Sequence, residues 1–416
     1  ELERLIYVAL TRSKYQIIVF NHIENKENIL NKNLLINLNN YNDYKSIKDF
    51  DLNNEEIDLI KNKFQIKINK QFDKLCKLQK DKKKIITYEK INIRSSYSSW
   101  IKGNNDSKIY NLDKDYDENS NENSISYKNY IFDKNSKDIY NLTRPNPLSD
   151  FPRGANSGTC LHKILERLDF KDINNINNLD NLIDEELSIY GIDKSFTKDI
   201  RKGLIRVINS SLGEKFNNQR LIDINLSDIA KELKFDLPIS IKGQNICANK
   251  LSKCFLLNKD YEFGEDYANS VKQLDINSKG FHSGCIDCLL KIKDNNNESK
   301  WWIIDWKSNF LINEDHKGSI PLSYNYENMR LEMIRHHYPL QSHLYLLAVH
   351  RLLKWRLHNY NPQKDLGGYI YIFLRGLPSE KINNKIQNNK FPFGIFVSSA
   401  PLDRVLFLDK LFNNEI

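Results

Sequence analysis

Two apolar segments separated by a short polar stretch constrain this chain more than any other feature. The segments are GCIDCLLKIK (284–293) and KWWIIDWKS (300–308), and DNNNES lies between them. Short apolar runs rich in β-branched and aromatic residues are typical of strands, whereas Asp, Asn and Ser favour turns. The sequence therefore predicts a β-hairpin whose turn is centred near Asn296.

Three charged residues of this hairpin fall close together. A turn centred on Asn296 places Asp287 opposite Asp305, and Lys307 shares the face of Asp305 because residues two apart in a strand point the same way. Carboxylates held this close repel each other unless a cation lies between them. Carboxylate oxygens suit Mg²⁺ or Mn²⁺, and a neighbouring lysine can orient a water or offset charge on a phosphate. The pattern indicates metal-assisted hydrolysis of phosphodiesters.

A surface hairpin that carries a salt bridge is the alternative interpretation, since charged cross-strand pairs are common. Asp305 argues against this alternative, because its carboxylate interrupts the apolar run WWIIDW. A charge in a buried strand is costly unless it is paired or bound to a metal.

The composition permits a nucleic-acid partner without requiring one. The chain has 416 residues, enough for two or more domains, and a net charge of +8. A basic protein of this kind can bind a polyanion. No stretch approaches the roughly 18 apolar residues of a membrane span, so we expect no membrane association. Because the sequence begins with Glu1 rather than methionine, we expect it to be a piece of a longer protein.

Six cysteines are scattered along the chain, and one pair, Cys285 and Cys288, has CxxC spacing. No second pair follows, and both residues lie in the strand predicted around Asp287. We therefore interpret them as packing residues rather than zinc ligands. Scattered cysteines without a disulfide pattern fit a reducing compartment.

The chain changes character twice along its length. Residues 1–85 combine helical and strand patterns in an Asn- and Lys-rich sequence. Residues 86–148 hold one short ordered piece, 86–103, and then a polar stretch, which together predict a partly disordered tether. Periodic apolar patterns return over 149–416 and predict a folded α/β domain.

The third segment opens with small residues ahead of a helix. Asn156 to Thr159 precede apolar positions at helical spacing, which places His162 in the first turn. A histidine there is either a site residue or a helix-terminal or core residue, and this stretch by itself favours the second interpretation. Glu232 lies near the start of a strand predicted over 231–240.

A long helix is predicted over 338–357. Gln341 and Tyr345 are four residues apart on it and share a face. This polar pair either reaches a base edge or a phosphate, or belongs to an amphipathic helix whose tyrosine packs. The remaining predicted elements are further helices through 175–220, strands over 367–376 and 394–401, and a helix over 401–413.

Three catalytic motifs do not occur in the sequence. There is no GxxxxGK[ST] loop to cradle phosphates, no GxSxG elbow and no HExxH. The missing phosphate loop argues against a free-standing ATPase.

Five short motifs, in this order, resemble the nuclease domain of the RecB family, the beta subunits of exodeoxyribonuclease V. They are GTCLH, the position of Glu232, GCIDCLL, IIDWKS and QSHLY. The resemblance covers 149–416, with a weaker similarity through 86–103. It implies the PD-(D/E)xK, restriction-endonuclease-like fold, a mixed sheet flanked by helices that contains the predicted hairpin.

The resemblance also implies a role for each matching residue. His162, Asp287 and Asp305 would bind Mg²⁺, or Mn²⁺ in its place. Lys307 would be the catalytic lysine. Asp-Trp-Lys replaces the more usual Asp-Tyr-Lys, and its tryptophan should point to the opposite face. Gln341 and Tyr345 match the QxxxY motif, which supports the active site and contacts DNA, and Glu232 matches an upstream acidic position.

Residues 1–85 resemble the end of a superfamily 1 helicase region. ELERLIYVALTRSK is similar to the last helicase motif, whose arginine, here Arg12, reaches the γ-phosphate of ATP. Because the P-loop is missing, ATP binding would belong to the intact protein and not to this chain.

For the intact protein, the resemblance implies ATP-dependent unwinding and degradation of linear DNA in break repair. RecC-like and RecD-like subunits would be its partners in the bacterial cytoplasm. The alternative function is a non-catalytic DNA-binding or scaffolding module with a nuclease fold. Relatives of that kind lose their carboxylates, whereas Asp287, Asp305 and Lys307 are all present.

Overall fold

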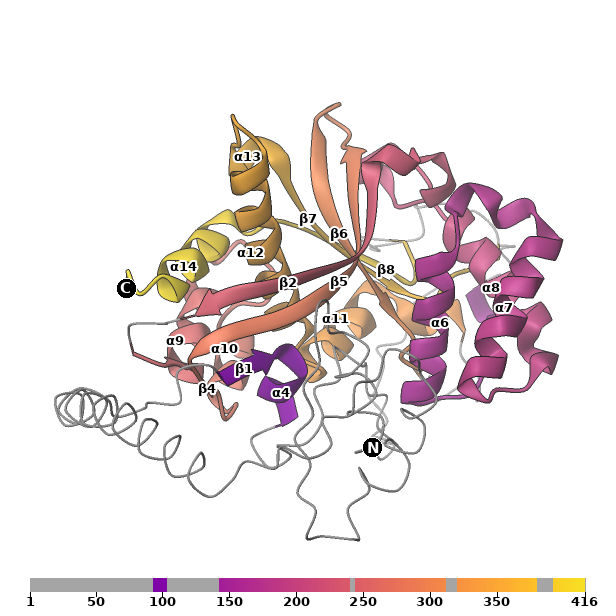
Figure 1. Cartoon of the computed structure of the whole chain (residues 1–416), viewed down its shortest axis with the longest axis horizontal. Helices are drawn as coiled ribbons and strands as arrows, with labels where there is room; N and C mark the ends of the chain where they lie inside the picture. The colour runs from indigo at the N-terminus through magenta and orange to yellow at the C-terminus, as the bar shows by residue number, and fades with distance from the viewer. Residues whose placement is uncertain (1–92, 103–141, 240–243, 312–319, 380–391, 416) are drawn as a thin grey trace, which may run out of the picture. The chain divides into compact units, whose positions relative to one another are not determined.

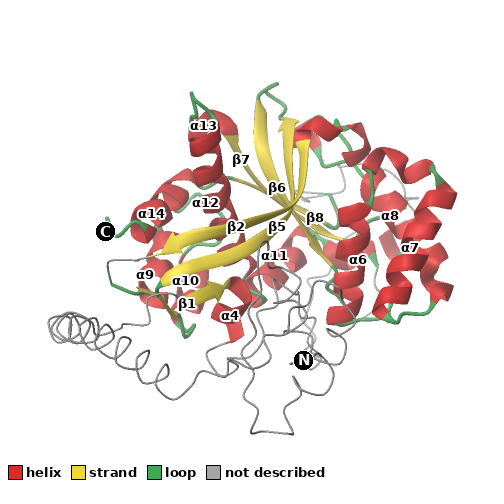
Figure 2. Cartoon of the chain, viewed as in Figure 1, coloured by secondary structure: helices red, strands yellow, loops and turns green. Residues whose placement is uncertain are grey.

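Helices cover both faces of a central mixed β-sheet (Figures 1 and 2). The computed structural model describes residues 93–102, 142–239, 244–311, 320–379 and 392–415. All of them belong to the second of the two units into which the chain divides, 88–416. Arg12 and the rest of the predicted helicase segment lie outside the described residues.

The sheet contains six strands, of which β5 (Gly280–Lys293) is the longest. One edge of β5 pairs with antiparallel β2 (Ile229–Ile239). The other edge is shared between two strands: β1 (Ile93–Ser96) runs parallel to the first residues of β5, and β6 (Ser299–Lys307) runs antiparallel to the last. Beyond β6 the sheet continues with parallel β7 (Leu366–Phe373) and antiparallel β8 (Ile395–Ser399).

Strands β5 and β6 separate in the middle of the sheet. Their ladder ends at Cys288 and Ile304, and β1 pairs with β5 as far as Ser283. β6 meanwhile stays paired with β7 through Lys307. The result is a fork between β5 and β6, and Asp287 is the first residue of β5 on its open side.

The hairpin forms in the predicted register. The pairing of Cys288 with Ile304 is the one that a turn centred on Asn296 requires. The carboxylate of Asp294 accepts hydrogen bonds from the backbone N–H groups of two turn residues, and Asn297 has a left-handed backbone with φ 63°. Asp and Asn adopt such turn conformations at low cost, so the polar stretch fixes the register.

Two buried clusters lie on opposite sides of the sheet. On one side, α12 (Tyr338–Arg356) is a central helix whose residues are all buried as far as His350. We call this side the α12 face; its cluster includes Ile303 and Tyr371. The other side, the α6 face, has a cluster that includes Ile304 and Trp306. It is covered by α6 (Ala155–Arg167), α7 (Ile176–Tyr190) and α8 (Thr197–Asn209).

The α12 face also carries several shorter helices from separate parts of the chain. The predicted helix over 338–357, the two strands after it and the final helix are all confirmed. No helix in the described ranges combines the length and the apolar character that a membrane crossing needs. The remaining elements are α4 (Tyr97–Lys102), β3 (Ile246–Cys247), α9 (Ala248–Ser252), α10 (Glu265–Lys272), β4 (Asn277–Ser278), α11 (Tyr326–Arg335), α13 (Pro362–Asp365) and α14 (Leu402–Phe412).

Helix α6 begins earlier than predicted. It starts at Ala155, directly after Gly154 with φ 107°, so that His162 lies two turns inside the helix rather than in its first turn. The small residues that were expected to precede the helix have a packing role within it. A Cβ on Gly158 would stand 3.0 Å from Oγ of Ser308, which follows β6. Small side chains therefore let α6 approach the end of β6 closely.

The short ordered piece expected at 86–103 belongs to the sheet. It contains β1 and α4: β1 pairs with β5, and Nε1 of Trp100 donates a hydrogen bond to Oγ of Ser278 at 2.6 Å. A strand of four residues is too short for periodicity to show that it joins the domain that follows. The described fold therefore begins before residue 149.

Candidate active site

The candidate site lies where β5 and β6 separate. The carboxylate of Asp287 on β5 accepts a hydrogen bond from the backbone N–H of Trp306 on β6 at 2.9 Å. Oδ1 of Asp305 lies 2.7 Å from Nζ of Lys307. These two residues are 2% and 1% exposed, which excludes the alternative of a surface hairpin with a salt bridge. Trp306 points to the opposite face, as predicted, and packs against Phe170.

Strands β2 and β5 both lose their regular alternation at a pair of acidic residues. In the register of their ladder, Glu232 lies opposite Asp287. Glu232 has a left-handed backbone, φ 49°, which costs free energy in a residue other than glycine. Ile286 lies in the cluster of the α12 face, whereas Cys288, two residues on, lies in that of the α6 face. Alternate residues of a regular strand share a face, so the acidic pair marks a local switch between the layers.

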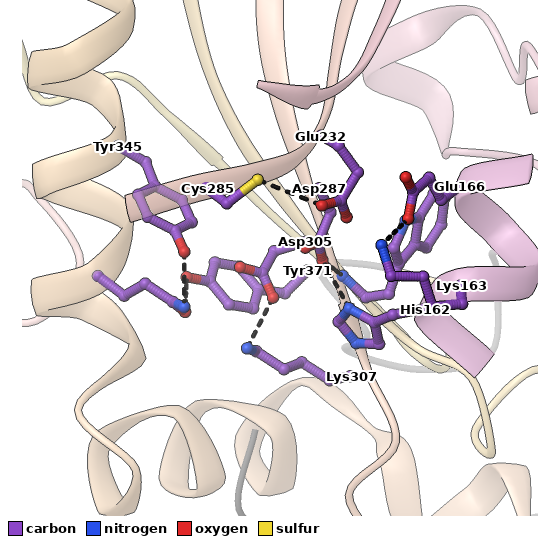
Figure 3. Close-up of polar contacts among 12 residues, drawn as sticks. His162, Lys163, Glu166, Glu232, Cys285, Asp287, Asp305, Lys307, Tyr345 and Tyr371 are labelled. Carbon is purple, nitrogen blue, oxygen red and sulfur yellow. Dashed lines mark hydrogen bonds and ion pairs between the residues drawn. The ribbon is translucent and has the colours of Figure 1, made fainter. Parts of the chain in front are cut away.

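His162 reaches the site from α6. Its Nδ1 lies 3.5 Å from Oδ2 of Asp287. Burial raises the pKa of Asp287, but His162, Lys307 and the N–H of Trp306 outweigh burial and hold the pKa below its usual value. Asp287 is therefore charged near neutral pH. Figure 3 shows Asp287 and Asp305 at the centre of the view, with Glu232 above them and His162 and Lys307 below.

Glu232, the predicted upstream acidic residue, adds a third carboxylate to this space. Burial and the charge of Asp287 raise the pKa of Glu232. The thiol of Cys285 donates a hydrogen bond to Oε2 of Glu232 at 3.3 Å. Cys288 lies instead in the cluster of the α6 face, where it packs, so the two thiols of the CxxC pair have different surroundings.

The donor set suits a hard divalent cation. Carboxylates from Glu232, Asp287 and Asp305 share the site with the ammonium of Lys307, and three carboxylates carry more negative charge than one ammonium offsets. Mg²⁺ or Mn²⁺ would offset that charge, and both ions take carboxylate oxygens. Among the described residues, no three His, Cys, Asp or Glu side chains lie close enough together to coordinate a metal ion. The fit to a metal is therefore one of chemistry and charge.

Gln341 and Tyr345 lie behind the site. Both are buried, and Nε2 of Gln341 donates a hydrogen bond to the hydroxyl of Tyr345 at 3.1 Å. Oε1 of Gln341 accepts a hydrogen bond from Tyr371 on β7 at 3.0 Å. These contacts make the pair a support for Tyr371, and its contact with DNA stays a prediction.

Two tyrosines beside Lys307 have no strong sequence signature. Nζ of Lys307 lies 4.0 Å from the ring centroid of Tyr338 and 5.5 Å from that of Tyr371. Tyr338 precedes Gln341 by three residues, a spacing that places both on one side of a helix. That spacing is the one signal in the sequence that could have identified Tyr338.

Curated relatives agree with the resemblance predicted from the motifs. The RecBCD enzyme subunit RecB of Mycolicibacterium smegmatis is 29% identical over 282 residues, which are 65% of this chain and 25% of that protein. The same subunit of Haemophilus influenzae is 26% identical over 306 residues, 73% of this chain and 21% of the relative. For the Escherichia coli subunit the identity is 27% over 262 residues, 63% of this chain and 19% of the relative. No family model matches the chain.

The chain thus spans about a fifth to a quarter of the length of these relatives. Their shared name describes each as a subunit of a RecBCD enzyme. The order of the motifs, the mixed sheet between helices and these similarities all agree. Over the matched part of its length, the chain is a RecB-type protein.

Proposed function

We propose that the described fold is a metal-dependent deoxyribonuclease of the PD-(D/E)xK class. The observation that carries this proposal is the fork between β5 and β6, around which Asp287, Asp305 and Lys307 are held together. Carboxylates that can hold a divalent cation beside a lysine suit the hydrolysis of phosphodiesters. The RecB-type sequence supports DNA as the substrate.

His162, Asp287 and Asp305 would hold the metal, which we expect to be Mg²⁺, with Mn²⁺ as a substitute. When bound, the ion supplies Lewis-acid chemistry to the phosphate and lowers the pKa of a bound water. The backbone N–H of Trp306 keeps Asp287 oriented and helps to keep it charged. Glu232 would act beside these ligands as a further acidic group.

Lys307 is the proposed catalytic lysine. Its ammonium, next to Asp305, would orient the attacking water or stabilise negative charge that develops on the phosphoryl oxygens. Lys307 is almost completely buried, so water screens its charge only weakly. Gln341 and Tyr345 would support this arrangement from behind through Tyr371.

For the intact protein, the proposed role is that of a RecBCD-type ATP-dependent helicase and exonuclease in double-strand break repair and the degradation of linear DNA. The name of the relatives supports this role, and it implies RecC-like and RecD-like partners in the bacterial cytoplasm. Arg12 and ATP would belong to the helicase part. A net charge of +8 fits binding to the DNA backbone without sequence readout, which should weaken steeply with salt.

The test is cleavage of linear single-stranded DNA by the full chain, with Mg²⁺ or with EDTA, beside Asp305→Asn. The full chain is needed because a chain that starts at residue 149 lacks β1 and α4. We expect cleavage that requires Mg²⁺ and is lost in the variant. Asp294→Asn is the matched control, since Asp294 is also a buried aspartate of this hairpin but serves the turn. It should lower stability and keep cleavage.

Binding of Mn²⁺, followed by electron paramagnetic resonance, separates the two candidate functions. A folded wild-type chain that binds Mn²⁺ and DNA but cuts nothing would favour the non-catalytic DNA-binding or scaffolding module. A chain that binds no Mn²⁺, or in which Asp305→Asn cuts as well as the wild type, would contradict the proposed centre.

A further inference from the structure

The ammonium of Lys307 is enclosed on two sides by different kinds of group. Asp305 lies on one side at 2.7 Å, and the ring of Tyr338 lies on the other, with its centroid at 4.0 Å. We propose that Tyr338 is a positioning residue, which holds the ammonium of Lys307 against Asp305 and aims it at the fork. This inference rests on the nuclease function proposed above and deepens it.

The ring contact is of a kind that fixes a cation. The face of a tyrosine ring carries negative charge density and attracts an ammonium group, more strongly where water is excluded. Lys307 is 1% exposed and Tyr338 is 4% exposed. Tyr371 stacks on Tyr338, with 5.6 Å between ring centroids and 22° between planes, and lies 5.5 Å from the same ammonium. The two rings therefore form an aromatic wall beside Lys307.

Tyr338 is itself anchored to the end of β6. Its hydroxyl donates a hydrogen bond to Oδ1 of Asn309 at 3.1 Å, and Nδ2 of Asn309 donates to Oε1 of Glu332 at 3.0 Å. Nε2 of His336 lies 2.9 Å from the same glutamate oxygen, and its ring stacks on Tyr338. Lys307 is the last residue of β6, and Asn309 follows it by two residues. The lysine and the residue that anchors Tyr338 are therefore close together in the chain.

The wall is also tied to the pair Gln341 and Tyr345. The hydroxyl of Tyr371 lies within hydrogen-bond distance of the backbone oxygen of Tyr338, at 3.2 Å, and of Oε1 of Gln341, at 3.0 Å. Gln341 in turn donates to Tyr345. A displaced Tyr338 would therefore disturb Lys307 first and the supporting pair second.

This arrangement answers a physical problem of the proposed chemistry. A lysine side chain is long and has many rotamers, while a small displacement of a catalytic group costs rate steeply. A carboxylate alone fixes the distance of the ammonium but not its direction. The ring of Tyr338 supplies the second constraint.

A double-mutant cycle tests the inference in the full chain. Tyr338→Leu and Tyr338→Phe are each made alone and together with Lys307→Ala, and kcat and KM are measured on linear single-stranded DNA. We expect Tyr338→Leu to lower kcat by about tenfold with little change in KM, and Tyr338→Phe, which keeps the ring, to lower it by less than about threefold. In the Lys307→Ala background, Tyr338→Leu should cause no further loss.

Phe255→Leu is the matched control. Phe255 is a buried aromatic residue of the same face, and its ring packs against Tyr267 and His343 instead. Its loss should lower stability and combine additively with Lys307→Ala. Tyr338→Met serves as a second variant if Tyr338→Leu does not fold, because methionine fills irregular space without a ring.

A second readout does not need activity. With lysine labelled by ¹³C at Cε, the methylene signal of Lys307, assigned from Lys307→Ala, should be shifted upfield by the ring of Tyr338. We expect Tyr338→Met to abolish that shift and Tyr338→Phe to retain it. An unchanged signal in Tyr338→Met, or losses of kcat that add to those of Lys307→Ala, would overturn the role of Tyr338. A wild-type chain that shows the shift and yet cuts no DNA overturns the nuclease function and, with it, the catalytic purpose of the wall.

Discussion

The two faces of the sheet differ in what they can hold. The cluster of the α6 face consists largely of aliphatic side chains, and its aromatic members are Phe151, Phe170, Phe216, Trp302 and Trp306. The α12 face buries Asp305, Lys307 and Gln341 beside its apolar residues. It also holds the buried tyrosines of the described residues, which are Tyr97, Tyr267, Tyr324, Tyr338, Tyr345, Tyr369 and Tyr371.

This difference teaches how a charged site can sit inside a folded core. A buried charge needs partners that an aliphatic layer does not offer. Tyrosine supplies an apolar body, a ring face for a cation and a hydroxyl that finds its own partner. The α6 face also buries Glu186 and Arg375, each with its own partners. Its contribution to the site is His162, at the fork where β5 and β6 part. The charged side chains Asp305 and Lys307 thus lie on the α12 face, and the α6 face serves mainly packing. His162 is the residue through which the α6 face reaches the site.

Two consecutive residues of β6 provide the largest expected contrast between the faces. Lys307→Met keeps an unbranched side chain, one atom shorter, and removes the charge from the α12 face, so kcat should fall by about 10³-fold. Trp306→Leu removes a ring from the α6 face, so the free energy of unfolding should fall by about 3 kcal/mol while kcat stays within about threefold. Nuclease kinetics and urea unfolding measure both. Equal losses of kcat in the two variants would contradict the proposed difference between the two faces.

His162→Ala tests whether the α6 face contributes to metal binding. If the histidine is the contribution of the α6 face to metal binding, the Mg²⁺ concentration for half-maximal cleavage should rise on the order of tenfold or more. Cleavage at saturating Mg²⁺ should change much less. Arg167→Ala is the control, because Arg167 lies on the same helix but pairs with Glu185 and Glu186 of α7. An unaltered Mg²⁺ requirement in His162→Ala would show that the α6 face contributes only packing and no metal ligand.

The sequence predicts the chemistry of the hairpin well, because that chemistry is local. Strand period and a polar turn are sufficient to place Asp287, Asp305 and Lys307 together, and the observed register agrees. His162 is different, since its contact with Asp287 depends on how α6 packs on the far side of the sheet. From its own segment the histidine looked like a core residue, and the resemblance to a family supplied what the local pattern lacked.

Elements that depend on distant partners are the ones that sequence patterns miss. The sequence predicts an ordered piece at 86–103 but not its place in the sheet, because β1 is a strand only where the first residues of β5 offer it an edge. Tyr338 is similar, because its place beside Lys307 follows from the docking of α12 on β6 and β7. In both cases the residue types are ordinary, and the partner decides the role.

The polar groups buried on the α12 face should make the fold sensitive to acid. Burial lowers the pKa of His282 and of His343 from 6.5 to about 3. Below pH 6.5 the unfolded chain binds protons on these rings that the folded chain does not. The free energy of unfolding should therefore fall as the pH drops from 6.5 toward 3, by about 1.4 kcal/mol per pH unit for each histidine.

Urea unfolding between pH 7 and pH 4 measures this slope. His282→Gln should flatten it, whereas His358→Gln should leave it unchanged because His358 is exposed. Identical slopes in the wild type and His282→Gln would mean that the buried histidine does not couple folding to protons.

The smallest expected effect concerns how closely the two layers must approach. A Cβ on Gly158 would stand 3.0 Å from Oγ of Ser308, so Gly158→Ala should move α6 by a few tenths of an ångström away from the end of β6. His162 would move with the helix, and the Mg²⁺ requirement should rise by about two- to threefold. Alanine also gains about 1 kcal/mol of helix propensity over glycine, so the free energy of unfolding should change little or rise.

The Mg²⁺ requirement would then rise although the free energy of unfolding does not fall. A glycine needed only for folding would not produce that combination. Because the close contact involves one side-chain oxygen, Ser308→Ala in the Gly158→Ala background should return the Mg²⁺ requirement to that of Ser308→Ala by itself. A requirement that stays raised in the double variant would show that the distance between α6 and β6 is not what sets the position of His162. The boundary between the faces would then have to be fixed elsewhere along α6.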